Sequence, residues 1–399
     1  MTGPPRSPRP GRWAVLAAGT AAQSACAAPL WGIPALAPAL RDAYALSLPQ
    51  TGLVLAAISL GMTVALLPWG MVADAIAGER AVTAAALGGA ACALAAAALG
   101  GGFAGGGSSG GFAVLFAACV AAGALGGGAI PGSGRAVTAW FEERERGLAL
   151  AIRQTGVTAG SFASAAVLPL VLAAGGLRAC FLTLAGFSLV CAVVSAVWLR
   201  DAGPAGEPTS GPPASPLRDG RVWRIAVCGM LLFPAQVSTA GFAVLFLHDA
   251  HGLSASSGGL VLAAIQLLGG ALRIGLGYWS DRRRSRVGVL RVLSLVIAAG
   301  IGLLALLAGS ATALAVAALV VGGALGQSWN GLLVTAVVEA AGRRGSGRAL
   351  GMQQTMLAVA GAAAPVAVAG IVGATSWRGG FAFGAACPAV AHALFRRAA

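Results

Sequence analysis

Two arginines lie inside long apolar stretches of this sequence, where an ionisable side chain has most scope for chemistry. Arg153 stands about two helical turns beyond Arg146, and Arg273 stands about two turns before Asp281. A charge held within a membrane is costly, so such a residue is first considered a binding or transport residue. Arg153 and Arg273 could therefore form a cationic site for an anionic solute. The alternative is that they form ion pairs or snorkel, and only hold helices together.

Neutral polar side chains occur at similar depths in other apolar stretches. The candidates for lining the same cavity are Gln23, Gln154, Gln236, Gln327, Asn330, Gln353 and Gln354. Amide groups can bind a polar solute, but in a membrane they also form hydrogen bonds between helices. The sequence is compatible with either role.

No other pattern indicates catalysis or metal binding. The 7 cysteines lie inside apolar stretches without metal-ligand spacing, and the 3 histidines belong to no cluster of histidine, cysteine and carboxylate residues. The sequence contains no P-loop and no HExxH motif. We therefore expect no cofactor, no metal ion and no enzymatic activity.

The composition indicates an integral membrane protein. Of the 399 residues, 58% are hydrophobic and 10% are charged, and the mean hydropathy is +0.84. A soluble domain contains about 25% charged residues. The formal net charge of +14 does not indicate nucleic-acid binding, because the arginines form short clusters between apolar stretches.

Twelve apolar stretches are long enough to cross a bilayer of about 30 Å as helices. They cover residues 13–40, 50–73, 81–100, 112–134, 148–172, 179–199, 223–247, 256–279, 288–308, 311–338, 349–373 and 379–395. A proline-rich polar segment, 200–222, separates the sixth from the seventh. We therefore predict an all-α membrane fold with a tail at 1–12, a six-helix bundle at 13–199, this linker, a second six-helix bundle at 223–395 and a tail at 396–399.

The arginine positions predict the orientation of these helices. All but Arg41, Arg178 and Arg378 of the 26 Lys+Arg residues fall on the side that would carry both termini. Because arginines near span ends stay in the cytoplasm, both termini should be cytoplasmic. We expect a monomer in the cytoplasmic (inner) membrane of a bacterium, in contact with lipid and a small-molecule substrate, with a coupling proton as an open alternative.

The two halves of the sequence repeat each other. Residues 52–58 (GLVLAAI) recur unchanged at 259–265. Five further pairs match along the two halves: Asp42 with Asp249, Gly70 with Gly277, Asp74 with Asp281, Gln154 with Gln354 and Arg178 with Arg378. A six-helix unit repeated with the same starting side predicts two pseudo-symmetric bundles related by an axis along the membrane normal.

A short motif of glycine, aspartate and arginine ends the second helix of each repeat. Its residues are Gly70, Asp74 and Arg80 in the first copy and Gly277, Asp281 and Arg282 in the second. This motif and the duplicated six-helix unit resemble the major facilitator superfamily. The resemblance implies that these residues gate the protein. Physically, each aspartate could accept amide hydrogen bonds from a facing helix and pair with arginines in one closed state.

The resemblance implies a secondary active transporter that works by alternating access. In the fifth stretch Ser161 stands where antiporters of this family have proline, and no carboxylate lies at mid-depth in the first, fourth or seventh stretch. These features favour uptake or uniport of a small polar or anionic solute. The alternative is a proton-coupled multidrug efflux antiporter of the same superfamily.

Charged residues at the opposite ends of the stretches form two repeat-related sets. The acids are Asp42 and Asp249, and the bases are Arg178 and Arg378. We expect each acid to pair with an arginine, or to cap a helix, when this side of the protein is closed. Exposed pairs contribute only about 0 to 1 kcal/mol, so they would bias one conformation rather than lock it. The alternative is that these are solvated loop charges.

Overall fold

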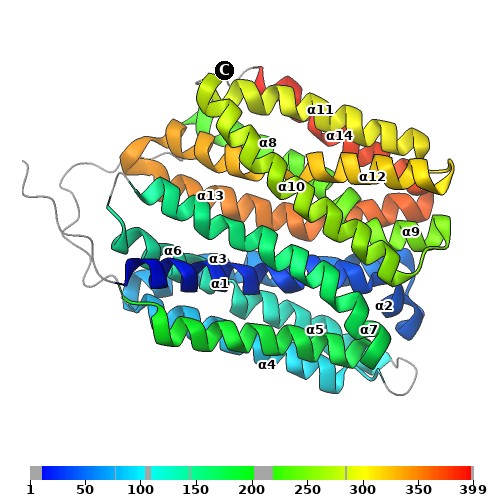
Figure 1. Cartoon of the computed structure of the whole chain (residues 1–399), viewed down its shortest axis with the longest axis horizontal. Coiled ribbons are helices and arrows are strands. Elements are labelled where there is room, and N and C mark those ends of the chain that lie inside the picture. The colour runs from blue at the N-terminus through cyan, green and yellow to red at the C-terminus, as the bar shows by residue number, and fades with distance from the viewer. Residues whose placement is uncertain are drawn as a thin grey trace, which may run out of the picture.

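The computed structural model describes residues 11–76, 78–103, 109–142, 145–201, 219–283 and 285–396, and every regular element in these ranges is a helix. The elements are α1 (Arg12–Gly32), η1 (Ile33–Leu36), α2 (Ala37–Tyr44), α3 (Leu48–Ile76), α4 (Glu79–Gly100), α5 (Ser109–Gly126), α6 (Ala129–Trp140), α7 (Arg146–Trp198), α8 (Gly220–Gln236), η3 (Val237–Gly241), α9 (Ala243–His251), α10 (Ala255–Arg283), α11 (Arg286–Leu307), α12 (Thr312–Gln327), α13 (Asn330–Ala374) and α14 (Trp377–Phe395). Figure 1 shows most of them side by side, with their long axes in one direction.

The described ranges contain nine helical stretches that are long and apolar enough to cross a membrane. One of them, Leu148–Trp198, holds two crossings, because α7 is kinked at Gly176 (φ 68°, ψ −171°). α13 is divided in the same way at Gly342 (φ 67°, ψ 173°), and its two parts already belong to two of the nine stretches, Thr312–Gly342 and Ala349–Ala374. Glycine adopts these positive φ angles without strain. With α14 and the path from α1 to α2, the described ranges provide twelve crossings, as the sequence predicts.

Some element boundaries differ from the predicted ones. α1 begins at Arg12, within the predicted tail, and α8 begins at Gly220, within the predicted linker. The start of α8 is fixed by Asp219, whose side chain accepts a hydrogen bond from the backbone N–H of Arg221 (2.8 Å). The fourth crossing continues to Trp140, beyond the predicted stretch 112–134. Residues 1–10 and 202–218 of the predicted tail and linker lie outside the described residues.

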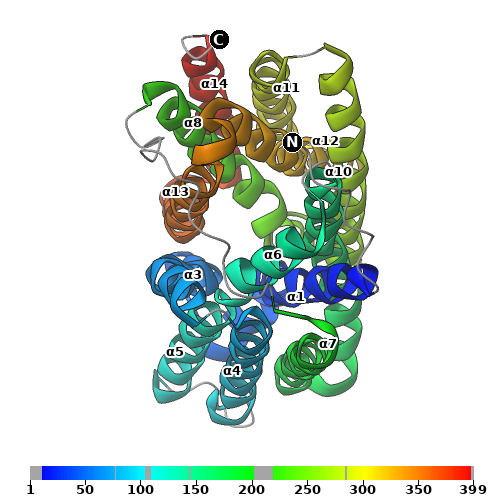
Figure 2. The ribbon, with the colours of Figure 1, turned by 90° about the vertical axis from the view of Figure 1, so that its left-hand side faces the viewer.

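The crossings form two bundles. In the first, α7 packs against α1 and α4, and α5 packs against α3 and α4. In the second, α14 packs against α8 and α11, and α12 packs against α10 and α11. Figure 2 views the helices nearly end-on and separates the group around α4 and α5 from the group around α8 and α11. The two bundles meet where α3 packs against α13 and α7 packs against α10.

The charged residues at the two ends of the helix bundles are paired in different ways. The end with the start of α1 and the end of α14 is called the basic face here, and the opposite end is called the distal face (Figure 1). Near the basic face, ion pairs join helices of the same bundle: Arg12 with Glu145 (2.8 Å), Arg135 with Glu79 (3.2 Å), and Arg286 with Asp281 and with Glu339 (3.1 Å). At the distal face, Arg41 of α2 forms an ion pair with Asp249 of α9, across the two bundles.

Glycines let the two bundles touch closely toward the distal face. A Cβ atom on Gly52 of α3 would lie 2.7 Å from the carbonyl oxygen of Pro365 on α13. A Cβ atom on Gly259 of α10 would lie 3.0 Å from the carbonyl oxygen of Ala165 on α7. In a membrane, small residues of this kind allow backbones to pack against each other. Together with the distal ion pair, these contacts fasten one bundle to the other.

Candidate functional site

Two crossings are interrupted at matching places in the two bundles. α5 ends at Gly126 and α6 begins at Ala129, while α12 ends at Gln327 and α13 begins at Asn330. The end of a helix leaves backbone oxygens without their usual donors. In membrane carriers, discontinuous helices near mid-depth build solute and ion sites. The two breaks are therefore where we look for the site.

Arg153 of α7 forms hydrogen bonds with the start of α6, directly after the first break. Its Nη2 donates to the carbonyl oxygen of Ile130 (2.8 Å) and to Oγ of Ser133 (2.9 Å), and its Nε donates to the same Oγ (3.2 Å). The residue is only 6% exposed. The structure thus places this guanidinium against α6, inside the first bundle.

Arg273 of α10 binds the second break in a looser way. Its Nη2 donates to the carbonyl oxygen of Gln327 (2.8 Å), and the residue is partly exposed. Its Nε is buried and has no hydrogen-bond partner among the described residues. Gly331 of α13 lies beside the stem of the arginine, since a Cβ atom there would be in van der Waals contact with Cγ of Arg273 (3.4 Å). Each break is therefore held by an arginine from another helix of its own bundle.

Amide side chains gather at the second break. Gln236 of α8 donates from Nε2 to Oε1 of Gln327, and Asn330 donates from Nδ2 to Oε1 of Gln236 (3.3 Å). Gly269 of α10 packs against this group, because a Cβ atom on it would lie 2.5 Å from Cβ of Gln327. Three of the predicted cavity residues, Gln236, Arg273 and Asn330, are thus brought together around Gln327.

The other predicted cavity residues lie elsewhere. Gln23 is buried on α1, where its Oε1 has no partner among the described residues. Gln353 is buried on α13, and neither atom of its amide group has a described partner. Gln154 on α7 and Gln354 on α13 are half-buried. These four side chains are not part of the cluster at the second break.

Two buried polar or aromatic residues, one on α10 and one at the second break, are not among the predicted ones. Gln266 lies on the same side of α10 as Gly269 and Arg273, at the i, i+3, i+7 spacing of one helix face. Trp329 precedes α13 and is fully buried. The spacing could have identified Gln266. Trp329 carries no such signal, because an aromatic residue in an apolar stretch is usually part of the core.

The motif residues have different surroundings in the two bundles. In the second copy Asp281 pairs with Arg286, and Arg282 lies over the ring of Tyr278 (4.5 Å to the centroid). Gly277 has open space beside it. In the first copy Arg80 is exposed and donates its backbone N–H to Oδ1 of Asp201 (2.9 Å). Gly70 and Asp74 belong to α3, but their side-chain environments lie outside the described part of the chain.

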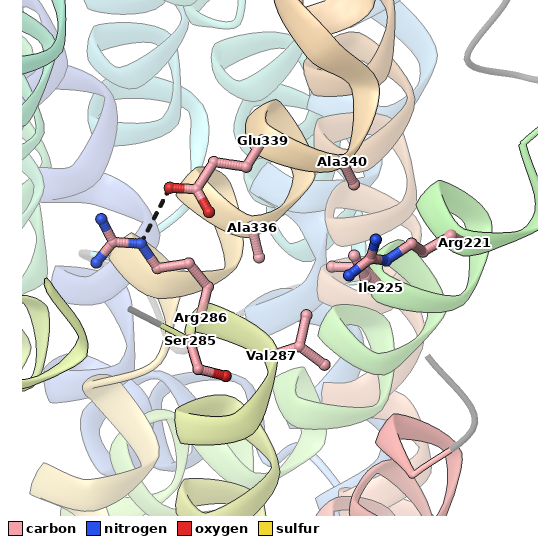
Figure 3. Close-up of a pocket in the computed structure, with 8 residues that line it drawn as sticks. All are labelled: Arg221, Ile225, Ser285, Arg286, Val287, Ala336, Glu339 and Ala340. Carbon is pink, nitrogen blue, oxygen red and sulfur yellow. Dashed lines mark hydrogen bonds and ion pairs between the residues drawn. The ribbon is translucent and has the colours of Figure 1, made fainter. Parts of the chain in front are cut away.

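A pocket of about 260 Å³ opens beside the second motif copy. It is lined by Arg221, Ile225, Ser285, Arg286, Val287, Ala336, Glu339 and Ala340. Figure 3 shows Arg286 reaching Glu339 on one side, with Arg221 on the other. Arg286 therefore joins the motif aspartate to the tenth crossing within one bundle.

The distal charges form one cross-bundle pair among the described residues. Asp249 pairs with Arg41, and neither Arg178 nor Arg378 is the partner that we expected for it. Asp42, Arg178 and Arg378 are exposed. Arg41 was not among the predicted pairs, because it has no arginine at the matching position of the second half.

Comparisons with known proteins agree with this geometry. Residues 19–365 match the Major Facilitator Superfamily. An uncharacterized MFS-type transporter of Mycobacterium tuberculosis, Rv2994, is 30% identical over 358 residues, which cover 89% of this chain and 78% of the relative. Among solved structures, a bacterial homologue of the human lysosomal transporter Spinster, in an inward-facing and occupied conformation, has a TM-score of 0.75 at 16% identity and covers 98% of this chain and 97% of its own. The xylose transporter XylE from E. coli has a TM-score of 0.73 at 13% identity, and 98% of each chain is covered. The chain therefore belongs to the major facilitator superfamily.

Proposed function

We propose that this carrier moves a small polar or anionic solute across the bacterial cytoplasmic membrane by alternating access, with its basic face in the cytoplasm. That it is a secondary transporter and not an enzyme follows from its family. The solute class and the orientation are the proposal. The orientation is supported by the arginine bias, since all but Arg41, Arg178 and Arg378 fall on the side of the termini.

The observation that carries the solute class is Arg273. The residue as a whole is partly exposed, its Nη2 has a backbone oxygen as its described partner, and its buried Nε has no described partner. A cation in the membrane-spanning region is stabilised where water, a carboxylate or a ligand can reach it. The amides of Gln236 and Asn330 beside it can orient a polar solute.

Counterflow in proteoliposomes tests this function. Vesicles that contain the purified protein are preloaded with one unlabelled solute, and entry of its labelled form is followed for benzoate, succinate, a neutral sugar and a cationic dye. We expect saturable counterflow of an acid or the sugar without an imposed pH gradient. Protein-free vesicles are the control.

The alternative function predicts a different pattern in the same vesicles. A proton-coupled multidrug antiporter would move the dye, and it would do so when a pH gradient is imposed. Movement of the dye alone would overturn the proposal in favour of efflux.

A further inference from the structure

The two membrane-embedded arginines lie near the same depth on neighbouring helices of opposite bundles. Gly270 of α10 faces Thr158 of α7, because a Cβ atom on Gly270 would lie 2.5 Å from Cγ2 of Thr158. Arg273 is about one helical turn from this contact, and Arg153 is between one and two turns from it. Both arginines lie on its basic side, since α7 starts at that face and α10 ends there. The different environments of Arg153 and Arg273 are therefore not caused by a difference in depth.

The two guanidinium groups differ in how fully they are bound. Arg153 makes three hydrogen bonds to oxygen atoms of the α6 segment and is 6% exposed. Arg273 makes one described hydrogen bond, is partly exposed, and keeps its Nε unpartnered. A buried donor without a partner costs about 1–3 kcal/mol, so a ligand that supplies an acceptor there gains that energy.

The unpartnered buried side-chain atoms of α10 and of the second break are all nitrogen atoms. The buried side-chain atoms on α10 and at the second break without a described partner are Nε2 of Gln266, Nε of Arg273, Nε2 of Gln327 and Nε1 of Trp329. Nε of Arg273 and Nε1 of Trp329 are donors in every orientation of the side chain. A site with a surplus of donors and a positive charge fits a ligand group that has only acceptors, such as a carboxylate or a phosphate.

We propose that the second bundle alone binds the acidic group of the solute, through Arg273 and the N–H groups of Gln266 and Gln327, and that Arg153 is a structural brace of the first break. This assignment rests on the proposed function and narrows its solute class to organic or inorganic anions. Arg273 then binds both the anion and the carbonyl oxygen of Gln327 at the end of α12. Anion binding therefore acts on the junction between α12 and α13.

Binding to matched variants tests the assignment. The stability of the purified full-length protein is followed in detergent as benzoate, succinate or inorganic phosphate is titrated, for wild type, Arg273→Gln and Arg153→Gln. Hydrogen bonds to charged groups contribute about 1.5–3 kcal/mol, so Arg273→Gln should weaken the apparent affinity about tenfold to a hundredfold. Arg153→Gln should unfold at a lower temperature than wild type and keep the anion affinity within about threefold.

A third variant allows the assignment to be tested even if Arg153→Gln does not fold. Gln266→Leu retains both arginines and removes one donor, so it should weaken anion binding by less than Arg273→Gln does. Equal affinity of wild type and Arg273→Gln, or a loss of affinity confined to Arg153→Gln, would overturn the assignment. So would a wild-type protein that binds none of the three anions. In that case counterflow of the neutral sugar would leave the proposed function standing, whereas movement of the dye alone would remove both.

Discussion

Gly61 and Gly123 hold the second and fourth crossings closer together than any side chain would permit. A Cβ atom on Gly61 would lie 1.9 Å from the carbonyl oxygen of Val120, and one on Gly123 would lie 2.0 Å from the carbonyl oxygen of Ile58. Backbone atoms cannot move aside as a flexible side chain can. The separation of α3 and α5 is therefore set at these two residues.

The substitution Gly61→Ala should lower the melting temperature of the purified protein. Overpacking of a tight interface typically costs about 1–3 kcal/mol, and here the clash is with backbone. Gly88→Ala on α4 is the matched control, because nothing lies within 4 Å of a Cβ atom there. It should leave the melting temperature unchanged or raise it, since alanine favours a helix over glycine by about 0.5–1 kcal/mol. Equal effects of the two substitutions would contradict this account of the interface.

At the scale of elements, the broken fourth crossing depends on the α7 arginine that spans it. Ser133 is fully buried, accepts two hydrogen bonds from Arg153, and donates its own hydroxyl to the carbonyl oxygen of Ala129 (2.6 Å). Its Oγ therefore connects the guanidinium on α7 to the first turn of α6. Without that oxygen, the buried guanidinium of Arg153 would lose two of its three described hydrogen bonds.

Ser133→Ala should destabilise the protein by about 1–3 kcal/mol, because it leaves donors of a buried cation unpaired. Ser294→Ala on α11 is the control: that hydroxyl is equally buried, and its described bond is to the carbonyl oxygen of Leu290 in its own helix (2.7 Å). Thermal unfolding in detergent compares the two. A loss for Ser294→Ala as large as that for Ser133→Ala would show that the guanidinium is not the cause.

The elements were more predictable from the sequence than the site. The lengths of the apolar stretches and the arginines between them predict twelve crossings, because burial in lipid depends directly on hydropathy. The same information gives the depth of Arg153 but not its rotation about the helix axis, and it is this rotation that directs the guanidinium to Ser133. The breaks within the fourth and tenth crossings were not predicted either, because a continuous and an interrupted helix can have the same hydropathy.

At the scale of the whole molecule, the two bundles are fastened at one end. The cross-bundle pair of Arg41 and Asp249 lies at the distal face, whereas the pairs named at the basic face join helices of one bundle. Gly373 of α13 lies in this distal seam, because its Cβ atom would lie 3.7 Å from Cδ of Pro49 in the other bundle. Opening the distal face requires the pair and the seam to separate.

Asp249→Asn should expose the distal seam. In a background whose native cysteines are replaced by alanine, Gly373→Cys should react faster with a membrane-impermeant thiol reagent when Asp249 is Asn, and Arg41→Gln should act alike. The increase should stay below about fivefold, since partly exposed pairs contribute about 0 to 1 kcal/mol. Arg178→Gln removes an exposed distal arginine outside this pair and should leave labelling unchanged. Labelling that responds to Arg178→Gln and not to Asp249→Asn would refute the role of the pair.

The kink of α7 at Gly176 also bears on how the chain enters the membrane during synthesis. Between Arg153 and Arg200, the sequence has a single charged residue, Arg178, which lies two residues after the kink at Gly176. A hairpin of two apolar helices with a turn this short has almost no hydrophilic segment to translocate. One arginine costs about 2.5–3.5 kcal/mol at mid-membrane on the insertion scale, and two flanking apolar helices offset it. The fifth and sixth crossings can therefore insert together as one unit, and their turn offers almost nothing for a protease or antibody to reach at the distal face.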